Sequence, residues 1–170
     1  MADGRASVVQ SPHILDFIAH SSAQTQRLGQ RLGELLSAGD LVLLTGEFGV
    51  GKTQFVKGVA AGLGSADLVT SPSFVLINEY HTRRPRLRLY HADLYRIENA
   101  AEVAALELDD LLLDGVGVVE WAERATSLWR YDHLAVALRH LNDTKRVIRM
   151  TPNGSRAIEL VEAFKQSVFL

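Results

Sequence analysis

The feature that most constrains this sequence is a glycine-punctuated segment, Gly46–Thr53, which matches the pattern GxxxxGK[ST]. It follows the apolar run of residues 41–44 and precedes a stretch of helical character that ends near Gly62. Glycines let the backbone wrap an anion with its N–H groups pointing inward, and the following helix directs the positive end of its dipole at the same anion. Lys52 can reach terminal phosphates, and the Thr53 hydroxyl can ligate Mg²⁺. The segment therefore predicts a nucleotide-binding loop.

Strand and helix signals alternate along the rest of the chain. Short apolar runs predict strands, and apolar residues at helical spacing predict helices. The expected strands cover residues 41–44, 74–77, 87–91, 116–119, 134–138 and 147–150, and the expected helices begin at Ser21 or Ser22, at Thr53, at Ala100 (two short helices) and at Arg156. Residues 83–86 predict a hairpin tip. Some expected strands are neighbours in the chain, which favours antiparallel pairing. The fold class is therefore α/β, a P-loop NTPase-like three-layer sandwich with a mixed central sheet.

Length and composition fit one globular domain. The chain has 170 residues, of which 47% are hydrophobic and 22% are charged. This length is enough to bury one hydrophobic core but too short for two full domains. We expect a flexible tail over residues 1–20 and a single domain over residues 21–170. The net charge of -2 argues against a protein that grips nucleic acid over its whole surface.

The absence of cysteine excludes several kinds of chemistry. Without Cys the chain has no disulfide framework, no thiolate metal site and no thiol nucleophile. No apolar run reaches the ~20 residues that a membrane span needs. These properties predict no membrane partner and a cytoplasmic location.

Two acidic residues are candidates to complete the nucleotide site. Asp93 and Glu120 each follow an expected strand, where a carboxylate can hold a metal or polarise a water molecule. The alternative for each is a helix cap or a solvated carboxylate. Trp121 can stack on a base or belong to the core, and the residues alone favour the core. Glu47, inside the loop, can be merely solvated.

The loop alone leaves the class of enzyme open. The guanine-reading motif Asn-Lys-x-Asp is absent, since the nearest segment is residues 142–145, so ATP is favoured over GTP. A small-molecule kinase remains an alternative, with Arg83, Arg84, Arg86 and Arg88 as a cationic lid over the site. A solvated loop is the simpler interpretation of that arginine run.

Further segments, taken together, resemble the TsaE (YjeE) family of bacterial ATPases. In chain order the matching segments are Thr25 with Leu28-Gly29, the loop Gly46–Thr53 continued by Gln54–Gly58, Thr70–Phe74, Asn78–Tyr80, Tyr90–Arg96 and Val119–Arg124. The match covers roughly residues 20–125. Ser73 stands where the family usually has Thr, and Phe48, Val50 and Gln54 also depart from the usual residues. None of these changes removes a ligand.

The resemblance implies a partner-dependent ATPase of tRNA threonylcarbamoyladenosine synthesis. Such a protein works with TsaD and TsaB and is thought to reset their complex between turnovers, without transferring the group itself. It meets tRNA indirectly, through that complex. The modified base is the adenosine next to the anticodon. The alternatives are the kinase and a nucleotide-sensing adaptor without significant hydrolysis.

The resemblance also implies roles for individual residues, with ATP and Mg²⁺ as cofactors. Lys52, Asp93 and Glu120 are the implied catalytic residues, and Thr53 and Glu120 the implied metal ligands. Ser71 and Ser73 belong to a switch that senses the γ-phosphate. The implied nucleotide contacts are Thr25, Gly46, Glu47, Phe48, Gly49, Val50, Gly51, Lys52, Thr53 and Trp121, with Trp121 against the adenine and Thr25 nearby. An arginine from residues 146–149 is a further candidate contact.

Overall fold

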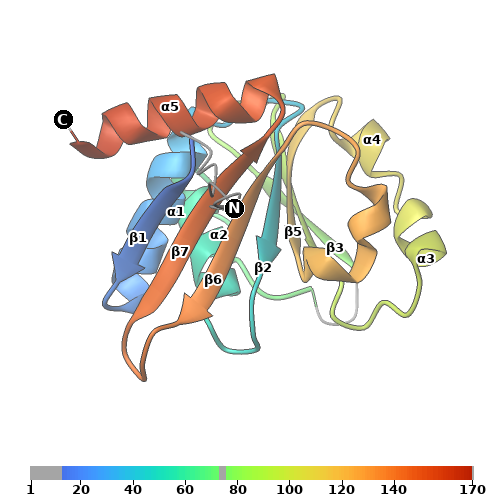
Figure 1. Cartoon of the computed structure of the whole chain (residues 1–170). Helices are drawn as coiled ribbons and strands as arrows, with labels where there is room; N and C mark the ends of the chain where they lie inside the picture. Colours follow the sequence, from blue (N-terminus) through green and yellow to red (C-terminus); the bar gives the residue numbers. More distant parts are fainter. Residues whose placement is uncertain (1–12, 73–75, 170) are drawn as a thin grey trace, which may run out of the picture.

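The computed structural model describes residues 13–72 and 76–169 and forms a seven-stranded sheet covered by helices (Figure 1). The elements are β1 (Leu15–Ala19), α1 (Ser22–Leu35), β2 (Leu41–Thr45), α2 (Lys52–Gly62), β3 (Ile77–His81), β4 (Arg88–Asp93), α3 (Ala100–Ala104), α4 (Leu108–Leu111), β5 (Gly115–Glu120), the 3-10 helix η1 (Ala122–Leu128), β6 (His133–His140), β7 (Arg146–Asn153) and α5 (Ser155–Phe169). Within this part of the chain, no helix is both long and apolar enough to cross a bilayer.

The sheet is mixed, as the sequence predicts. Its strand order is β1-β7-β6-β2-β5-β4-β3. The four central strands β6, β2, β5 and β4 are parallel. β7 is antiparallel to β6, β1 to β7, and β3 to β4. The carboxyl ends of the central parallel strands therefore meet at one edge of the sheet, where β2 leads into the glycine-rich loop.

Helices cover both faces of the sheet, which confirms the predicted three layers. Alternate residues of β2 belong to two hydrophobic clusters, one on each face of the sheet. Val42 and Leu44 pack in the cluster that includes α1, α2 and α5. Leu41 and Leu43 pack in the cluster that includes α3 and η1. A strand buried on both faces reads as a continuous apolar run rather than an alternating one. This explains the apolar run before the loop.

Glycines bring α1 and α2 into close contact. Gly29 of α1 faces the backbone of Phe55 and Val59, and Gly58 of α2 faces the backbone of Gln26 and Gln30. A Cβ atom at either glycine would collide with main-chain atoms of the facing helix. The helix that continues the loop is thus fixed against its neighbour by backbone contact.

Two predicted boundaries are wrong. Residues 15–19 belong to the predicted tail 1–20, yet they form β1 and pair with β7. Four of these five residues are apolar and only Asp16 is polar, so the segment shows no clear strand alternation and is a short, weak signal. The second strand was expected over residues 74–77, but the described strand is Ile77–His81, an edge strand that is half-polar. Residues 73–75 lie outside the described part.

Candidate nucleotide-binding site

The loop between β2 and α2 has the backbone of an anion cradle. Gly49 and Gly51 have φ angles of 75° and 114°, which L side chains rarely adopt. Gly51 caps α2, so the N-terminus of an 11-residue helix opens onto the loop. Free N–H groups and the helix dipole both favour a phosphate there.

Lys52 places a buried ammonium beside the loop. Its side chain donates from Nζ to the carbonyl oxygens of Gly46 and Glu47, at 2.5 and 2.8 Å, and the residue is only 5% exposed. Burial lowers the pKa of Lys52 below 10.5, while Glu120, Glu123, Asp93 and Glu47 oppose that shift. A phosphate oxygen would give this ammonium a stronger partner than two neutral carbonyls.

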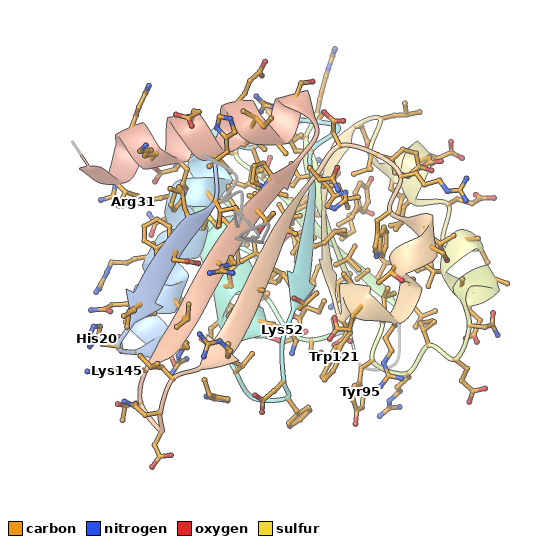
Figure 2. The ribbon with its side chains drawn as sticks, in the orientation of Figure 1. His20, Arg31, Lys52, Tyr95, Trp121 and Lys145 are labelled. Carbon is orange, nitrogen blue, oxygen red and sulfur yellow. The ribbon has the colours of Figure 1, made fainter. Side chains whose placement is uncertain are left out.

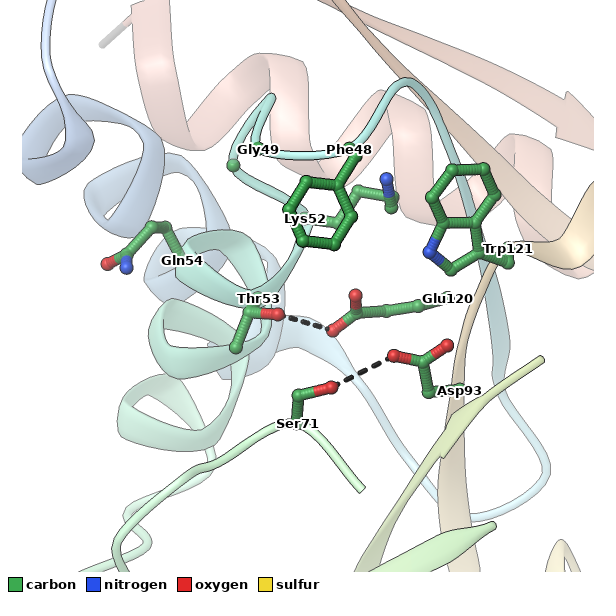
Figure 3. Close-up of a pocket in the computed structure, with 10 residues that line it drawn as sticks. Phe48, Gly49, Lys52, Thr53, Gln54, Ser71, Asp93, Glu120 and Trp121 are labelled. Atoms are coloured by element: carbon green, nitrogen blue, oxygen red, sulfur yellow. Dashed lines mark hydrogen bonds between the residues drawn. The ribbon is translucent and has the colours of Figure 1, made fainter. Parts of the chain in front are cut away.

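The two predicted acids meet at the carboxyl edge of the sheet. Asp93 and Glu120 are partners in the register of β4 and β5. The Thr53 hydroxyl donates to Glu120 Oε1 at 2.9 Å, and the Ser71 hydroxyl donates to Asp93 Oδ2 at 2.9 Å (Figure 3). Glu120 is 3% exposed, so it is not the solvated carboxylate of the simpler alternative.

The residues around Glu120 suit Mg²⁺. Mg²⁺ takes oxygen ligands in an octahedron and usually keeps waters and substrate phosphates among them. The Thr53 hydroxyl and the Glu120 carboxylate supply two such oxygens side by side, and Asp93 is the neighbour of Glu120 on the adjacent strand. No group of three or more His, Asp or Glu residues that could hold a metal by itself occurs in the described ranges. The donor set therefore fits an ion shared between protein and nucleotide.

These side chains surround a cleft of about 370 Å³. It is lined by Phe48, Gly49, Gly51, Lys52, Thr53, Gln54, Ser71, Asp93, Glu120 and Trp121. Figure 2 shows Lys52, Trp121 and Tyr95 together at this end of the molecule. The glycine-rich loop, Asp93, Glu120 and Ser71 thus share one cavity.

Comparison with known proteins identifies the family. The family model for "Threonylcarbamoyl adenosine biosynthesis protein TsaE" matches residues 19–148. The chain belongs to the TsaE family. Curated relatives named "tRNA threonylcarbamoyladenosine biosynthesis protein TsaE" include one from Nostoc, 44% identical over 81% of this chain and 85% of the relative, and one from Treponema pallidum, 39% identical over 77% and 96%.

A solved structure supports the same assignment. The crystal structure of Bacillus subtilis YdiB superposes with a TM-score of 0.77, at 30% identity, over 91% of this chain and 95% of that chain. The resemblance to the TsaE family and the P-loop NTPase-like fold are thereby confirmed.

Trp121 lies over the lysine of this TsaE-family site. The ring centre of Trp121 is 4.1 Å from Lys52 Nζ, and Tyr95 packs on the indole with ring centres 5.0 Å apart. Phe48, which is 81% exposed, contacts the ring of Tyr95, so the three aromatic side chains reach from Lys52 to the surface of the cleft. Trp121 is half-buried and also borders the second hydrophobic cluster, so it lines the cleft and packs against the core at once.

Thr25 lies at the other end of the loop. It is fully buried on α1, and its hydroxyl donates to Ser21 O at 3.3 Å. Its methyl group and the guanidinium of Arg146 both face Gly51. Arg146 Nε is buried and has no hydrogen-bond partner in the part of the chain that the structure describes. Arg146 is the arginine of residues 146–149 that approaches the loop.

Two of the predicted nucleotide contacts have side chains that lie away from the cleft. Val50 is fully buried in the core, and Glu47 is exposed at the loop, so neither side chain lines the cleft. Ser73 lies outside the described residues. His91, assigned no role in the sequence, is fully buried and contacts Glu120 at 2.8 Å. Its position two residues before Asp93, on the same strand face, is the signal that could have found it.

The arginine-rich hairpin is not a lid over the cleft. Arg88 pairs with Gly115 at the start of β5, at the opposite edge of the sheet from Glu120. Arg84 donates to Leu36 O at the end of α1, and Arg88 pairs with Glu79. The cationic lid expected of a small-molecule kinase is therefore wrong, because the direction of β4 carries these arginines away from the loop.

Proposed function

We propose that this protein binds ATP with Mg²⁺ in the cleft, hydrolyses it, and acts in tRNA threonylcarbamoyladenosine synthesis by resetting a complex of TsaD and TsaB. One observation carries the catalytic part: the Thr53 hydroxyl lies 2.9 Å from the Glu120 carboxylate, in the cleft that Lys52 and Asp93 also line. The names of the relatives support the pathway. The partners follow from the family resemblance.

Each side chain has a task in this proposal. The loop N–H groups and Lys52 bind the β- and γ-phosphates, and Thr53 and Glu120 hold the metal. Bound Mg²⁺ would neutralise charge on the phosphate oxygens. Asp93 orients the attacking water by accepting one of its hydrogens, and the hydroxyl of Ser71 keeps the carboxylate in place.

The geometry favours a revised position for the adenosine. In an extended nucleotide the base and the terminal phosphate lie at opposite ends. Trp121 covers the Lys52 ammonium, which serves the terminal phosphates, whereas Thr25 and Arg146 border Gly51. We therefore assign the adenosine to the side of Thr25 and Arg146, and assign Trp121 to the cover of the terminal phosphates.

Replacing the central carboxylate separates binding from hydrolysis. Glu120→Gln should lower kcat by about 10²-fold or more in the presence of TsaD and TsaB, with a much smaller change in ATP affinity, because the lost charge acts mainly in the transition state. Glu123→Gln is the matched control, since Glu123 also acts on the charge of Lys52 but is exposed. Calorimetry with ATP and a phosphate-release assay measure the two quantities. A Glu120→Gln protein that hydrolyses ATP at the wild-type rate would refute the proposal.

A further inference from the structure

A buried histidine, His91, contacts Glu120, the candidate metal ligand, on the side away from the cleft. His91 of β4 is 0% exposed, and its Nε2 lies 2.8 Å from Glu120 Oε1, the same oxygen that accepts from Thr53. A carboxylate oxygen only accepts, so Nε2 carries the hydrogen of this contact, and in the tautomer with its hydrogen on Nε2 the Nδ1 atom is an acceptor. Outer contacts of this kind fix the orientation of a metal ligand.

Behind His91 the contacts continue to Thr70. The Tyr80 hydroxyl lies 3.5 Å from His91 Nδ1. The same hydroxyl donates to Thr70 O at 3.0 Å and accepts from the Thr70 N–H and from Asn78 Nδ2, both at 3.2 Å. Thr70 precedes Ser71, whose hydroxyl donates to Asp93. One side chain thus joins the backbone before Ser71 to the histidine that supports Glu120.

The Tyr80 hydroxyl has one hydrogen and two acceptors. Thr70 O, at 3.0 Å, takes it in this arrangement, because the 3.5 Å separation from His91 Nδ1 is at the limit of a hydrogen bond. A small movement of His91 toward Tyr80 would change that balance. Glu120 and His91 share a short hydrogen bond, so displacement of the carboxylate moves the imidazole.

We infer that Tyr80 and His91 are positioning residues that couple the carboxylate of Glu120 to the backbone at Thr70, so that metal and nucleotide at the cleft alter how Thr70 and Ser71 are held. The inference rests on the proposed function. The Ser71 hydroxyl in turn donates to Asp93. Glu120 and Asp93 are therefore connected twice: directly, as neighbours on β5 and β4, and through His91, Tyr80 of β3 and the chain at residues 70–71. The substitutions Tyr80→Phe and His91→Gln would fill similar space without this connection.

Removing one oxygen atom tests the coupling. Tyr80→Phe deletes the hydroxyl, and Tyr90→Phe is the matched control: Tyr90 is 8% exposed on β4, and its hydroxyl donates to Asp114 at 3.0 Å, next to the start of β5 and away from the cleft. The first readout is hydrogen exchange of the Thr70 amide, with and without Mg²⁺ and a non-hydrolysable ATP analogue. The second readouts are ATP affinity and kcat.

Tyr80→Phe should abolish the nucleotide-dependent change in Thr70 exchange and lower kcat about 3- to 10-fold, the value of one hydrogen bond, with ATP affinity within about 3-fold of wild type. Tyr90→Phe should match the wild type in all three measurements. His91→Gln, which retains a donor for Glu120 but lacks the Nδ1 acceptor, should uncouple Thr70 in the same way while Mn²⁺, used as a probe of the metal site, still binds.

Three results would overturn the inference. The first is a nucleotide-dependent change at Thr70 that survives in Tyr80→Phe. The second is an equal loss in Tyr90→Phe, and the third is unfolding of Tyr80→Phe alone, which would make the hydroxyl purely structural. If the wild-type protein itself bound no ATP, the proposed function would fail instead, and that outcome is visible before any variant is compared.

Discussion

Gly58→Ala tests whether backbone contact between α1 and α2 positions the phosphate loop. In an ordinary helix interior this substitution is stabilising, because alanine is favoured over glycine by about 1 kcal/mol. Here a Cβ at residue 58 would lie 2.9 Å from the carbonyl carbon of Gln26 and from the backbone nitrogen of Gln30, and closer still to the Gln26 oxygen. Helix propensity and steric contact therefore act in opposite directions.

The steric term is the larger one. Non-bonded carbon atoms normally rest about 3.5–4.0 Å apart, so the 2.9 Å contact with the Gln26 carbonyl carbon alone requires α1 and α2 to separate by about 0.6 Å, and the closer contact with the Gln26 oxygen requires more. Overpacking costs typically 1–3 kcal/mol, and main-chain atoms on both sides place this case at the upper end. After subtraction of the propensity gain, we expect a net loss of about 2 kcal/mol, which lowers Tm by about 4–8 °C in a domain of this size.

Thermal unfolding followed by circular dichroism measures the change. Ala61→Gly, on an exposed position of the same helix, supplies the propensity term in isolation and should cost about 1 kcal/mol. Since α2 begins at the loop, Gly58→Ala should also weaken ATP binding measured by calorimetry. A Tm equal to or above that of the wild type would show that the helices yield without cost, and would refute the reasoning.

Three further predictions concern the site itself. Lys52→Ala should abolish tight ATP binding with an unchanged far-UV spectrum, because it removes a phosphate contact from a loop; calorimetry showing wild-type affinity in a folded variant would contradict this. The pKa of Lys52 is lowered by burial, so in the window below 10.5 the folded apo-protein binds fewer protons than the unfolded chain, and its stability rises with pH there. Bound phosphates raise the pKa of Lys52 again, so ATP binding at alkaline pH should take up protons. Calorimetry should then show a binding heat that depends on the ionisation enthalpy of the buffer. The Lys52→Arg variant should lack this dependence. ATP or a non-hydrolysable analogue should strengthen association with TsaD and TsaB relative to ADP, and these partners should raise the ATPase rate; equal pull-down affinity in both nucleotides without stimulation would exclude partner gating.

The sequence predicted the parts of the site that depend on strand ends. The apolar runs before Gly46, Asp93 and Glu120 are buried parallel strands. Parallel strands place their carboxyl ends at one edge, so three separate segments of sequence could be assigned to one cavity. This reasoning needs no side-chain detail.

Contacts between elements that are distant in the sequence could not be predicted in this way. The strand β1 has only five residues and depends on contacts that are distant in sequence: it pairs with β7, and Phe17 packs edge-on against Phe164 of α5. The positions of Trp121 and Thr25 at different ends of the loop depend on the φ of 57° at Trp121 and on the packing of α1, neither of which a pattern of residue types encodes. His91 reads as an ordinary core residue until its partner is known.

The two acids of the cleft support a divalent cation as part of the proposed reaction. Glu120 accepts from Thr53 and His91, and Asp93 accepts from Ser71 and from the Tyr95 amide. Two carboxylates thus line a cleft in which Lys52 is a buried cation. A polyphosphate entering this cleft would meet like charge at the metal end. A divalent ion would remove this repulsion, which supports the proposal that ATP binds as its magnesium complex.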